Sequence, residues 1–261
     1  MAASRLYRVE GVVLKSAPLG EGDLLVTLLT RDGSKLRAMA WGARKLTSRK
    51  MGHLELLTRV DLALSKGRNL DTITQAHSLE AFNVMKSGLE STAKAFYLAE
   101  MVDGFAIEDG ANPPLYSLFL DALRAVQDSP EDNATVPHFQ LSLLQVTGFM
   151  PELYRCVECR QQILPSDHRF SIDLGGVLCS GCVPTGARIA PLSLQALKVL
   201  RHFHRSLEPN SSSLQVSDSL HQELRSILDG ATRYWLDREV RSRAFMDQVG
   251  RQKSESSAPR G

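Results

Sequence analysis

Four cysteines, gathered within residues 156–182, are the residues whose spacing most clearly indicates chemistry. They form two Cys-x2-Cys pairs separated by nineteen residues. Two intervening residues let a tight turn aim both thiolates at a single ion, about 2.3 Å from each sulfur. The separation of the pairs lies within the range of tetrahedral zinc sites. The sequence therefore predicts one zinc ion bound by Cys156, Cys159, Cys179 and Cys182.

The predicted zinc ion is structural rather than catalytic. A catalytic zinc keeps one coordination position open, whereas four cysteines complete the shell. We expect the ion to cross-link and stabilise the long connection between the helices before residue 150 and those after residue 190. The alternative, a redox-active Cys-x2-Cys pair, is disfavoured because two such pairs occur together outside any βαβ pattern.

A second group of chemistry-bearing residues is a basic segment between residues 31 and 50. A cation-lined strand beside an aromatic ring is the combination that single-strand binders use, with charge for the phosphates and a ring face for a base. Trp41 lies inside this segment and either stacks on a base or packs internally, with packing slightly favoured by its place at the end of a strand. The predicted DNA-binding residues are Lys35, Arg37, Arg44, Lys45, Arg49 and Lys50.

Motifs of known catalytic sites are absent from the sequence. It contains no Walker phosphate loop, no Gly-x-Ser-x-Gly elbow and no His-Glu-x-x-His motif. His202 and His204 are two residues apart on a predicted helix and therefore face different ways. We expect a binding protein rather than an enzyme.

The basic segment must be positioned by the first 80 residues, which have the pattern of an all-β domain. Tyr7, Val9 and Val13 alternate with polar residues, as in a half-buried strand. Asp32-Gly33 is a strong hairpin signal. Further strands are predicted at 24–29, 35–41, 54–65 and 71–80. Five short strands without an intervening helix favour an OB-fold, and an SH3-like barrel is the alternative.

From about residue 82 the apolar residues recur at helical spacing. Apolar faces are expected around residues 98–105, 113–126, 136–146, 192–207 and 217–235, with Pro113-Pro114 opening one helix and Ser217 capping another. The predicted class is α+β: an N-terminal five-stranded OB-fold barrel, followed by an all-α helical domain with a four-cysteine zinc-finger insertion. The expected limits are 1–81 for the barrel, 82–250 for the helical domain with its zinc finger at 151–187, and 251–261 for a disordered tail.

The charge of the chain is unevenly distributed, although the net charge is only +2. Residues 1–80 carry 13 basic and 8 acidic residues, whereas residues 81–150 carry 3 and 9. This distribution favours a front end that contacts a polyanion, although chance clustering of solvated charge is the alternative. The sequence shows neither an export signal nor a run of 18 apolar residues, so we expect a cytoplasmic protein.

Taken together, the motifs resemble those of the RecO family of bacterial recombination mediators. The resemblance is carried by Gly20-Glu21-Gly22-Asp23 before a strand, by Leu28-Leu29-Thr30-Arg31-Asp32-Gly33, by Trp41-Gly42-Ala43-Arg44-Lys45 followed by Ser48-Arg49, and by the four cysteines. These features follow one another in the family's order over roughly residues 5–240. The zinc-bearing members have their cysteines at the same place.

The resemblance implies a function in gap repair and in the RecF pathway of homologous recombination. Proteins of this family bind single- and double-stranded DNA, mainly through the OB-fold, and anneal complementary strands. They are partners of RecR and of the acidic C-terminal tail of single-stranded DNA-binding protein, and so help to load RecA. The alternative interpretation is a zinc-containing RNA- or ribosome-associated factor, which would also combine a basic barrel with paired cysteine knuckles.

Overall fold

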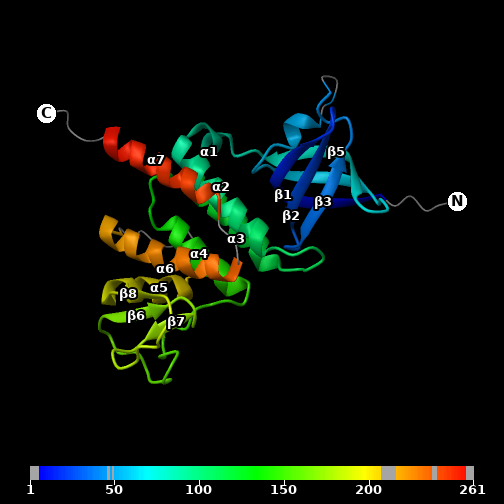
Figure 1. Ribbon diagram of the computed structural model, residues 1–261. Coiled ribbons are helices and arrows are strands. Elements are labelled where there is room, and N and C mark those ends of the chain that lie inside the picture. Colours follow the sequence, from blue (N-terminus) through cyan, green and yellow to red (C-terminus); the bar gives the residue numbers. More distant parts are fainter. Residues whose placement is uncertain (1–5, 46–47, 49, 207–215, 237–239, 257–261) are drawn as a thin grey trace. The chain divides into compact units, whose positions relative to one another are not determined.

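The computed structural model describes residues 6–45, 48, 50–206, 216–236 and 240–256, apart from the side chains of residues 251 and 253–256 (Figure 1). The chain divides into two compact units. The first consists of residues 1–127 and 241–261, and the second of residues 128–240. The first and last parts of the sequence therefore belong to the same unit.

Five strands of the first unit close into a barrel, in the order β1-β2-β3-β5-β4 (Figure 1). The barrel closes through antiparallel pairing of β1 with β4, and β3 pairs with β5 in parallel. This confirms the predicted OB-like barrel. The strands are β1 (Leu6–Leu19), β2 (Asp23–Thr30), β3 (Lys35–Ala40), β4 (Arg59–Ser65) and β5 (Asp71–Glu80).

The barrel core follows the two-residue alternation of the strands. On β3, Leu36, Ala38 and Ala40 face the core, together with alternate residues of β2 and β4. One predicted strand, 54–65, is too long at its start, because β4 begins only at Arg59. The backbone of Leu57 has a positive φ of 60°, which an extended strand cannot accommodate.

The turn between β2 and β3 is docked against the segment that precedes helix α3. Gly33 has φ +80°, and a Cβ there would lie 1.8 Å from the Asn112 carbonyl oxygen, so only glycine fits. The Asn112 N–H donates to the Asp32 carbonyl at 2.7 Å, and the Lys35 N–H donates to the Ile107 carbonyl at 2.9 Å. The Asp-Gly turn therefore both reverses the chain and anchors the barrel to the helical part of its own unit.

The helices of the first unit are α1 (Asn83–Ser87), α2 (Leu89–Phe105), α3 (Pro113–Asp128) and α7 (Ser242–Ser256). Pro113-Pro114 opens α3 as predicted. Helix α7, which we did not predict, packs against α2 (Figure 1). Residues 251–256 were expected to belong to a disordered tail, but they continue α7; residues 257–261 lie outside the described residues.

Glu100 of α2 explains why α7 begins where it does. Its carboxylate accepts hydrogen bonds from the N–H groups of Arg241 and Ser242, at 2.8 and 2.7 Å. The first N–H groups of a helix have no partner within the helix, and a carboxylate there also complements the helix dipole. The guanidinium of Arg243 lies over the Tyr97 ring at 5.3 Å. A mostly polar segment is thus held as a helix by contacts with α2.

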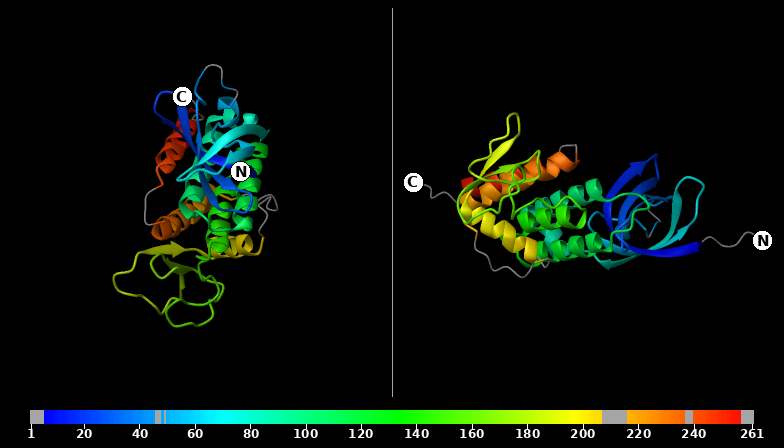
Figure 2. Two further views of the ribbon diagram at one scale, coloured as in Figure 1. Left: turned by 90° about the vertical axis from the view of Figure 1, so that its right-hand side faces the viewer. Right: turned by 90° about the horizontal axis from the view of Figure 1, so that it is seen from below.

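In its described residues, the second unit combines three helices with a small sheet. The sheet has the order β7-β6-β8, and Figures 1 and 2 show it beside α5 and α6. The antiparallel pairing of β6 with β7 places a hairpin between the two cysteine pairs. The elements are α4 (Thr135–Val146), β6 (His168–Ser171), β7 (Gly176–Leu178), β8 (Ile189–Leu192), α5 (Leu194–Arg205) and α6 (Asp218–Leu236).

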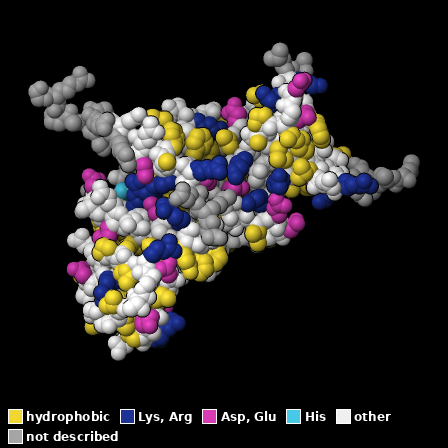
Figure 3. Space-filling view, in the orientation of Figure 1, with side chains coloured by type: hydrophobic (Ala, Val, Ile, Leu, Met, Phe, Trp, Pro, Cys, Tyr) yellow, Lys and Arg dark blue, Asp and Glu magenta, His cyan; other side chains and the backbone are white. Residues whose placement is uncertain are grey.

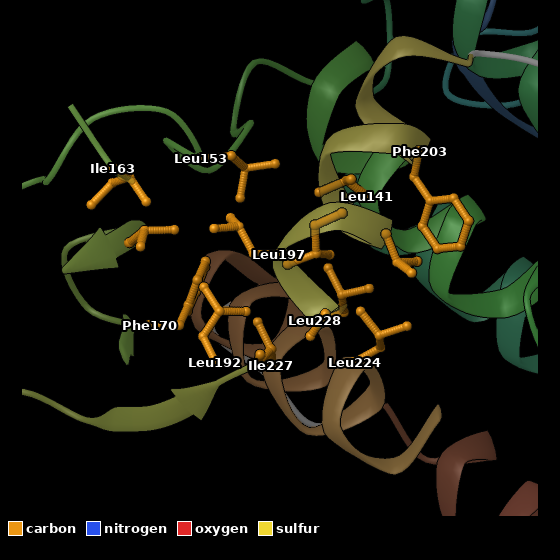
Figure 4. Close-up of a cluster of buried hydrophobic side chains, with 14 of the residues drawn as sticks. Leu141, Leu153, Ile163, Phe170, Leu192, Leu197, Phe203, Leu224, Ile227 and Leu228 are labelled. Carbon is orange, nitrogen blue, oxygen red and sulfur yellow. The ribbon is translucent and has the colours of Figure 1, made fainter. Parts of the chain in front are cut away.

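One continuous core joins the sheet region to these helices (Figure 4). Leu153, Ile163 and Phe170 of the cysteine-bearing insertion pack into the same buried cluster as the apolar faces of α5 and α6. Ser193 caps α5, because its hydroxyl accepts from the Ala196 N–H at 3.1 Å. The predicted cap of α6 is also present, with the Leu220 N–H 3.4 Å from the Ser217 hydroxyl. None of the helices in the described ranges has the length and apolar character needed to cross a membrane.

Candidate metal centre and nucleic-acid interface

The four cysteines predicted as metal ligands come together in the second unit. Their sulfur atoms all lie within 4.8 Å of one another, and the sulfurs of Cys159 and Cys179 are 3.7 Å apart. Cys156 is buried and Cys159 is exposed. Four thiolates at this separation could hold one metal ion. In the part of the chain that the structure describes, no other group of three or more His, Cys, Asp or Glu residues does so.

The backbone around each cysteine pair forms a tight turn. The Arg160 N–H donates to the Cys156 carbonyl at 3.0 Å, and Arg160 itself adopts a positive φ of 62°. In the second pair, the Cys182 N–H donates to the Cys179 carbonyl at 3.3 Å. The Cys179 N–H lies 3.4 Å from the Cys156 sulfur, so the second turn also contacts the first. Both turns therefore present their sulfurs to a common centre.

Arg169 of β6 positions the second cysteine pair, a role that the sequence analysis missed. Its guanidinium donates to the carbonyl of Ser180 at 2.9 Å and contacts that of Cys182 at 3.5 Å. β6 pairs with β7, and β7 leads directly into Cys179. The hairpin thus carries one ligand pair and supplies the cation that shapes its turn.

The thiols of the cluster differ in acidity. Burial raises the pKa of Cys156, but the N–H groups of Cys179, Cys159 and Glu158 outweigh burial and lower this pKa to about 6. The pKa of Cys182 is raised to about 12, because its thiol donates to the neighbouring sulfurs of Cys179 and Cys159 and is partly desolvated. Metal binding requires thiolates. The lowered pKa of Cys156 favours the thiolate form of this ligand.

In the first unit, two turns that are distant in sequence form one end of the barrel. The Gly42 N–H donates to the Asp23 carboxylate at 2.7 Å, and the Arg44 N–H donates to the Gly22 carbonyl at 2.9 Å. The stem of Lys45 lies over Gly22 and Gly42, with its carbons 3.6 Å from where a Cβ of either glycine would stand. The Gly20–Asp23 turn and the Trp41–Lys45 segment are therefore one structural feature.

Three of the predicted DNA-binding residues are exposed on the barrel: Arg37, Arg44 and Lys45. Arg37 has a single long ion pair, 3.8 Å from Glu108, and its side chain is 46% exposed. The Arg44 guanidinium donates to the Gly20 carbonyl at 3.4 Å, and it forms no ion pair with the residues that the structure describes. These cations can reach an anionic ligand without breaking a short ion pair.

Two other predicted cations are directed inward. The Lys35 ammonium donates to the Asp103 carbonyl and lies 3.5 Å from the Asp103 carboxylate, and its side chain is only 18% exposed. The Lys50 ammonium donates to the Ile73 carbonyl at 3.1 Å and to the Trp41 carbonyl at 3.5 Å. The remaining candidate, Arg49, lies outside the described residues.

Trp41 is exposed, which corrects our preference for internal packing. Its residue surface is 55% exposed, because the alternation of β3 directs it away from the core that Ala38 and Ala40 face. Its ring N–H donates to the Thr72 hydroxyl of β5 at 3.3 Å. Figure 3 shows hydrophobic side chains gathered beside Lys and Arg side chains on one face of the barrel region.

Asp23 is a site residue that the sequence analysis did not assign. It holds the turn after β3 from the start of β2, and its bond to Gly42 supports the segment that carries Arg44 and Lys45. The sequence feature that could have identified Asp23 is its place at the end of a glycine-containing turn. That turn was used above only as part of the family resemblance.

The fold and the sites define a class of protein: an OB-like barrel followed by a helical region that carries a four-cysteine cluster able to hold a metal ion. Two family models match the chain, "Recombination protein O N terminal" over residues 1–82 and "Recombination protein O C terminal" over residues 87–244. The chain belongs to the recombination protein O (RecO) family.

Individual relatives match along nearly the whole chain. The "DNA repair protein RecO" of Roseiflexus sp. (strain RS-1) is 38% identical over 255 residues, which cover 98% of this chain and 89% of the relative. The protein of the same name from Desulforudis audaxviator is 36% identical over 247 residues, with 94% and 97% covered. The one from Pelotomaculum thermopropionicum is 33% identical over 254 residues, with 97% and 98% covered.

Proposed function

We propose that this protein is a non-enzymatic, DNA-binding recombination mediator that acts in gap repair in the cytoplasm. It binds single- and double-stranded DNA, anneals complementary strands and, with RecR, helps to load RecA onto strands coated by single-stranded DNA-binding protein. The proposal is carried by membership of the RecO family over both of its regions. The OB-like barrel with exposed cations at one end supports it independently.

The proposed DNA contacts are made by the exposed cations Arg37, Arg44 and Lys45 of the barrel. Phosphate contacts by such side chains supply sequence-independent affinity. Lys35 and Lys50 act differently in this proposal, because each ammonium already binds groups of the protein. Lys35 joins the barrel to α2, and Lys50 supports the backbone of Trp41 and Ile73. Arg49 remains a proposed contact from its place in the sequence.

The metal that the cysteine cluster holds is proposed to be one zinc ion with a structural function. Four thiolate donors are the set that zinc takes in closed structural sites, and the sulfurs lie close enough to share an ion. When bound, the ion cross-links the turn at Cys156 to the turn at Cys179. The residues of the insertion then enclose the core that they share with α5 and α6.

The proposed domain limits assign DNA binding to the barrel and the metal site to the helical domain. In this proposal, residues 1–81 form the DNA-binding barrel, and the helical domain begins at residue 82, carries the zinc finger at 151–187, and extends past the expected limit at 250 because α7 continues to Ser256. The proposed protein partners are RecR and the acidic C-terminal tail of single-stranded DNA-binding protein, with RecA reached indirectly.

The experiment that tests this function measures binding of the purified protein to single-stranded DNA, duplex DNA and RNA over a range of salt concentrations, followed by annealing of complementary strands. We expect binding to both DNA forms, weakening steeply with salt, and annealing faster than the spontaneous rate. Preference for structured RNA without annealing would instead support the RNA-associated alternative.

A further inference from the structure

The exposed ring of Trp41 is not needed by the barrel that carries it. It follows the last residue of β3 on the outward face, whereas the core is filled by residues of the opposite face, including Ala38 and Ala40. More than half of the surface of Trp41 stays exposed to water, with 55% accessible. Tryptophan is enriched at binding interfaces, because its ring offers a large apolar face together with a polar N–H group.

The ring is nevertheless held in place. Its N–H donates to the Thr72 hydroxyl at 3.3 Å, and Thr72 is anchored in β5, where it is the register partner of Met39 in the parallel pair. The Trp41 carbonyl is 3.5 Å from the Lys50 ammonium, and the chain then turns at Gly42, whose φ is +62°. One edge and the backbone are fixed, so little rotamer freedom remains to be lost when a ligand binds.

Within the described ranges, no second aromatic ring and no cation is found stacked on the ring of Trp41, which is more than half exposed. The other tryptophan of the chain, Trp235, differs in this respect: it is 42% exposed, but it stacks on Phe149 at 4.6 Å and contacts the edge of Tyr234 at 5.2 Å. Two tryptophans of similar exposure thus differ in whether a ring face is already used.

Cations flank Trp41 on both sides in sequence. Arg37 lies four residues earlier on the same face of β3, about 13 Å away along an extended strand. Arg44 and Lys45 follow in the next turn, both exposed. The phosphates on either side of a base bound at Trp41 would meet positive charge in each direction. A duplex cannot use this ring in the same way, because its bases are stacked and paired.

We propose that Trp41 is a stacking platform for one unpaired base, and that it makes the barrel prefer single-stranded over duplex DNA. This inference rests on the proposed DNA-binding function and adds to it the residue that distinguishes single-stranded from duplex DNA. The exposed cations bind both forms through phosphates, whereas the ring binds only the form with accessible bases.

The test compares Trp41→Ala with Trp41→Phe and with the matched control Trp235→Ala. Each variant is titrated with an oligothymidine strand, with a duplex of equal length, and with an abasic strand that keeps the phosphates but lacks bases. Trp41→Ala should weaken oligothymidine binding by roughly 5- to 150-fold, the loss expected for one stacked base. It should change duplex and abasic-strand binding by less than about twofold. Trp41→Phe should retain most of the affinity, and Trp235→Ala should bind as the wild type does.

Melting curves of the three variants show whether each one is folded, and Trp41→Phe keeps the test valid if the alanine variant is unstable. An unchanged oligothymidine affinity in folded Trp41→Ala would overturn the inference while leaving the proposed function intact. Equal losses for all three ligands would also overturn it, because they would assign Trp41 to the fold or to phosphate binding. A wild-type protein that binds no DNA would refute both the inference and the proposed function.

Discussion

Lys35 and Arg37 are separated by one residue on the same face of β3, yet the structure gives them different environments. The Lys35 ammonium is mostly buried against Asp103 of α2. The Arg37 guanidinium is nearly half exposed and has only a long contact with Glu108. Strand alternation predicted the shared face correctly. It could not predict that Asp103, 68 residues later in the chain, would bind one of the two cations.

Removal of Lys35 and removal of Arg37 should therefore have different effects on stability and on DNA binding. Lys35→Ala should lower the free energy of unfolding by about 1–3 kcal/mol, because a buried carboxylate loses one of its charged partners. Its effect on the salt dependence of DNA binding should be small. Arg37→Ala should change stability by less than about 0.5 kcal/mol and reduce the salt slope of DNA binding by about one unit.

Urea unfolding and DNA titrations on both variants make this comparison. If Lys35→Ala left stability unchanged but weakened DNA binding as Arg37→Ala does, the assignment of Lys35 to the fold would be wrong.

At the scale of elements, Glu10 joins strand β1 to β4 and to α3. Its carboxylate accepts from the Arg59 guanidinium at 2.9 and 2.7 Å, and from the Tyr116 hydroxyl at 2.8 Å. Burial raises the pKa of Glu10, but the bonds from Arg59 and Tyr116 outweigh burial and lower this pKa below its usual 4.5. Burial of Tyr116, together with its hydrogen bond to Glu10, raises the pKa of Tyr116 to about 12.

A lowered carboxyl pKa in the folded state means that this contact stabilises the protein above the ordinary pKa, near 4.5. The stabilisation is lost as the pH falls below that value through the folded-state pKa. Glu10→Gln should thus cost about 1.5–3 kcal/mol of unfolding free energy at pH 7. Its difference from the wild type should shrink as the pH is lowered from 5 towards 3. Unfolding curves across this range provide the measurement, and a difference independent of pH would contradict the account.

The insertion that carries the four cysteines is the element whose stability we expect to depend most on a bound metal ion. Cys156→Ser should abolish stoichiometric metal and lower the free energy of unfolding by about 4 kcal/mol or more, as expected for loss of a structural metal. Ser180→Ala is the matched control, because Ser180 lies between the ligands of the second pair and contributes its carbonyl, which the substitution keeps.

Metal analysis should give about one zinc per chain for the wild type and for Ser180→Ala. A metal-free wild-type protein, or a metal-free variant of unchanged stability, would contradict the structural role. The ligands could be predicted from spacing alone, since Cys-x2-Cys geometry is local. The role of Arg169 could not, because β6 meets the second cysteine turn only through the pairing of the sheet.

At the scale of the whole molecule, the chain returns at its end to the unit in which it began. The barrel could be predicted because alternation and the Asp32-Gly33 turn are local signals. Helix α7 could not: residues 242–256 are mostly polar, and their helix is held by Glu100 and Tyr97 of α2. Within the helix, Arg243 also pairs with Asp247 at 3.1 Å.

The central claim is that the barrel binds DNA through the cations of the turn after β3, and its most direct test is the salt dependence of binding. The measurement compares the wild type with Arg44→Ala/Lys45→Ala and with a control that removes the same charge from α5, Lys198→Ala/Arg205→Ala, where both residues are exposed. The barrel variant should lose affinity equally for unrelated sequences. Its slope of log K against log salt should fall by about one unit per lost phosphate contact. The control should match the wild type. An unchanged slope in the barrel variant, or an equal loss in the control, would contradict the claim.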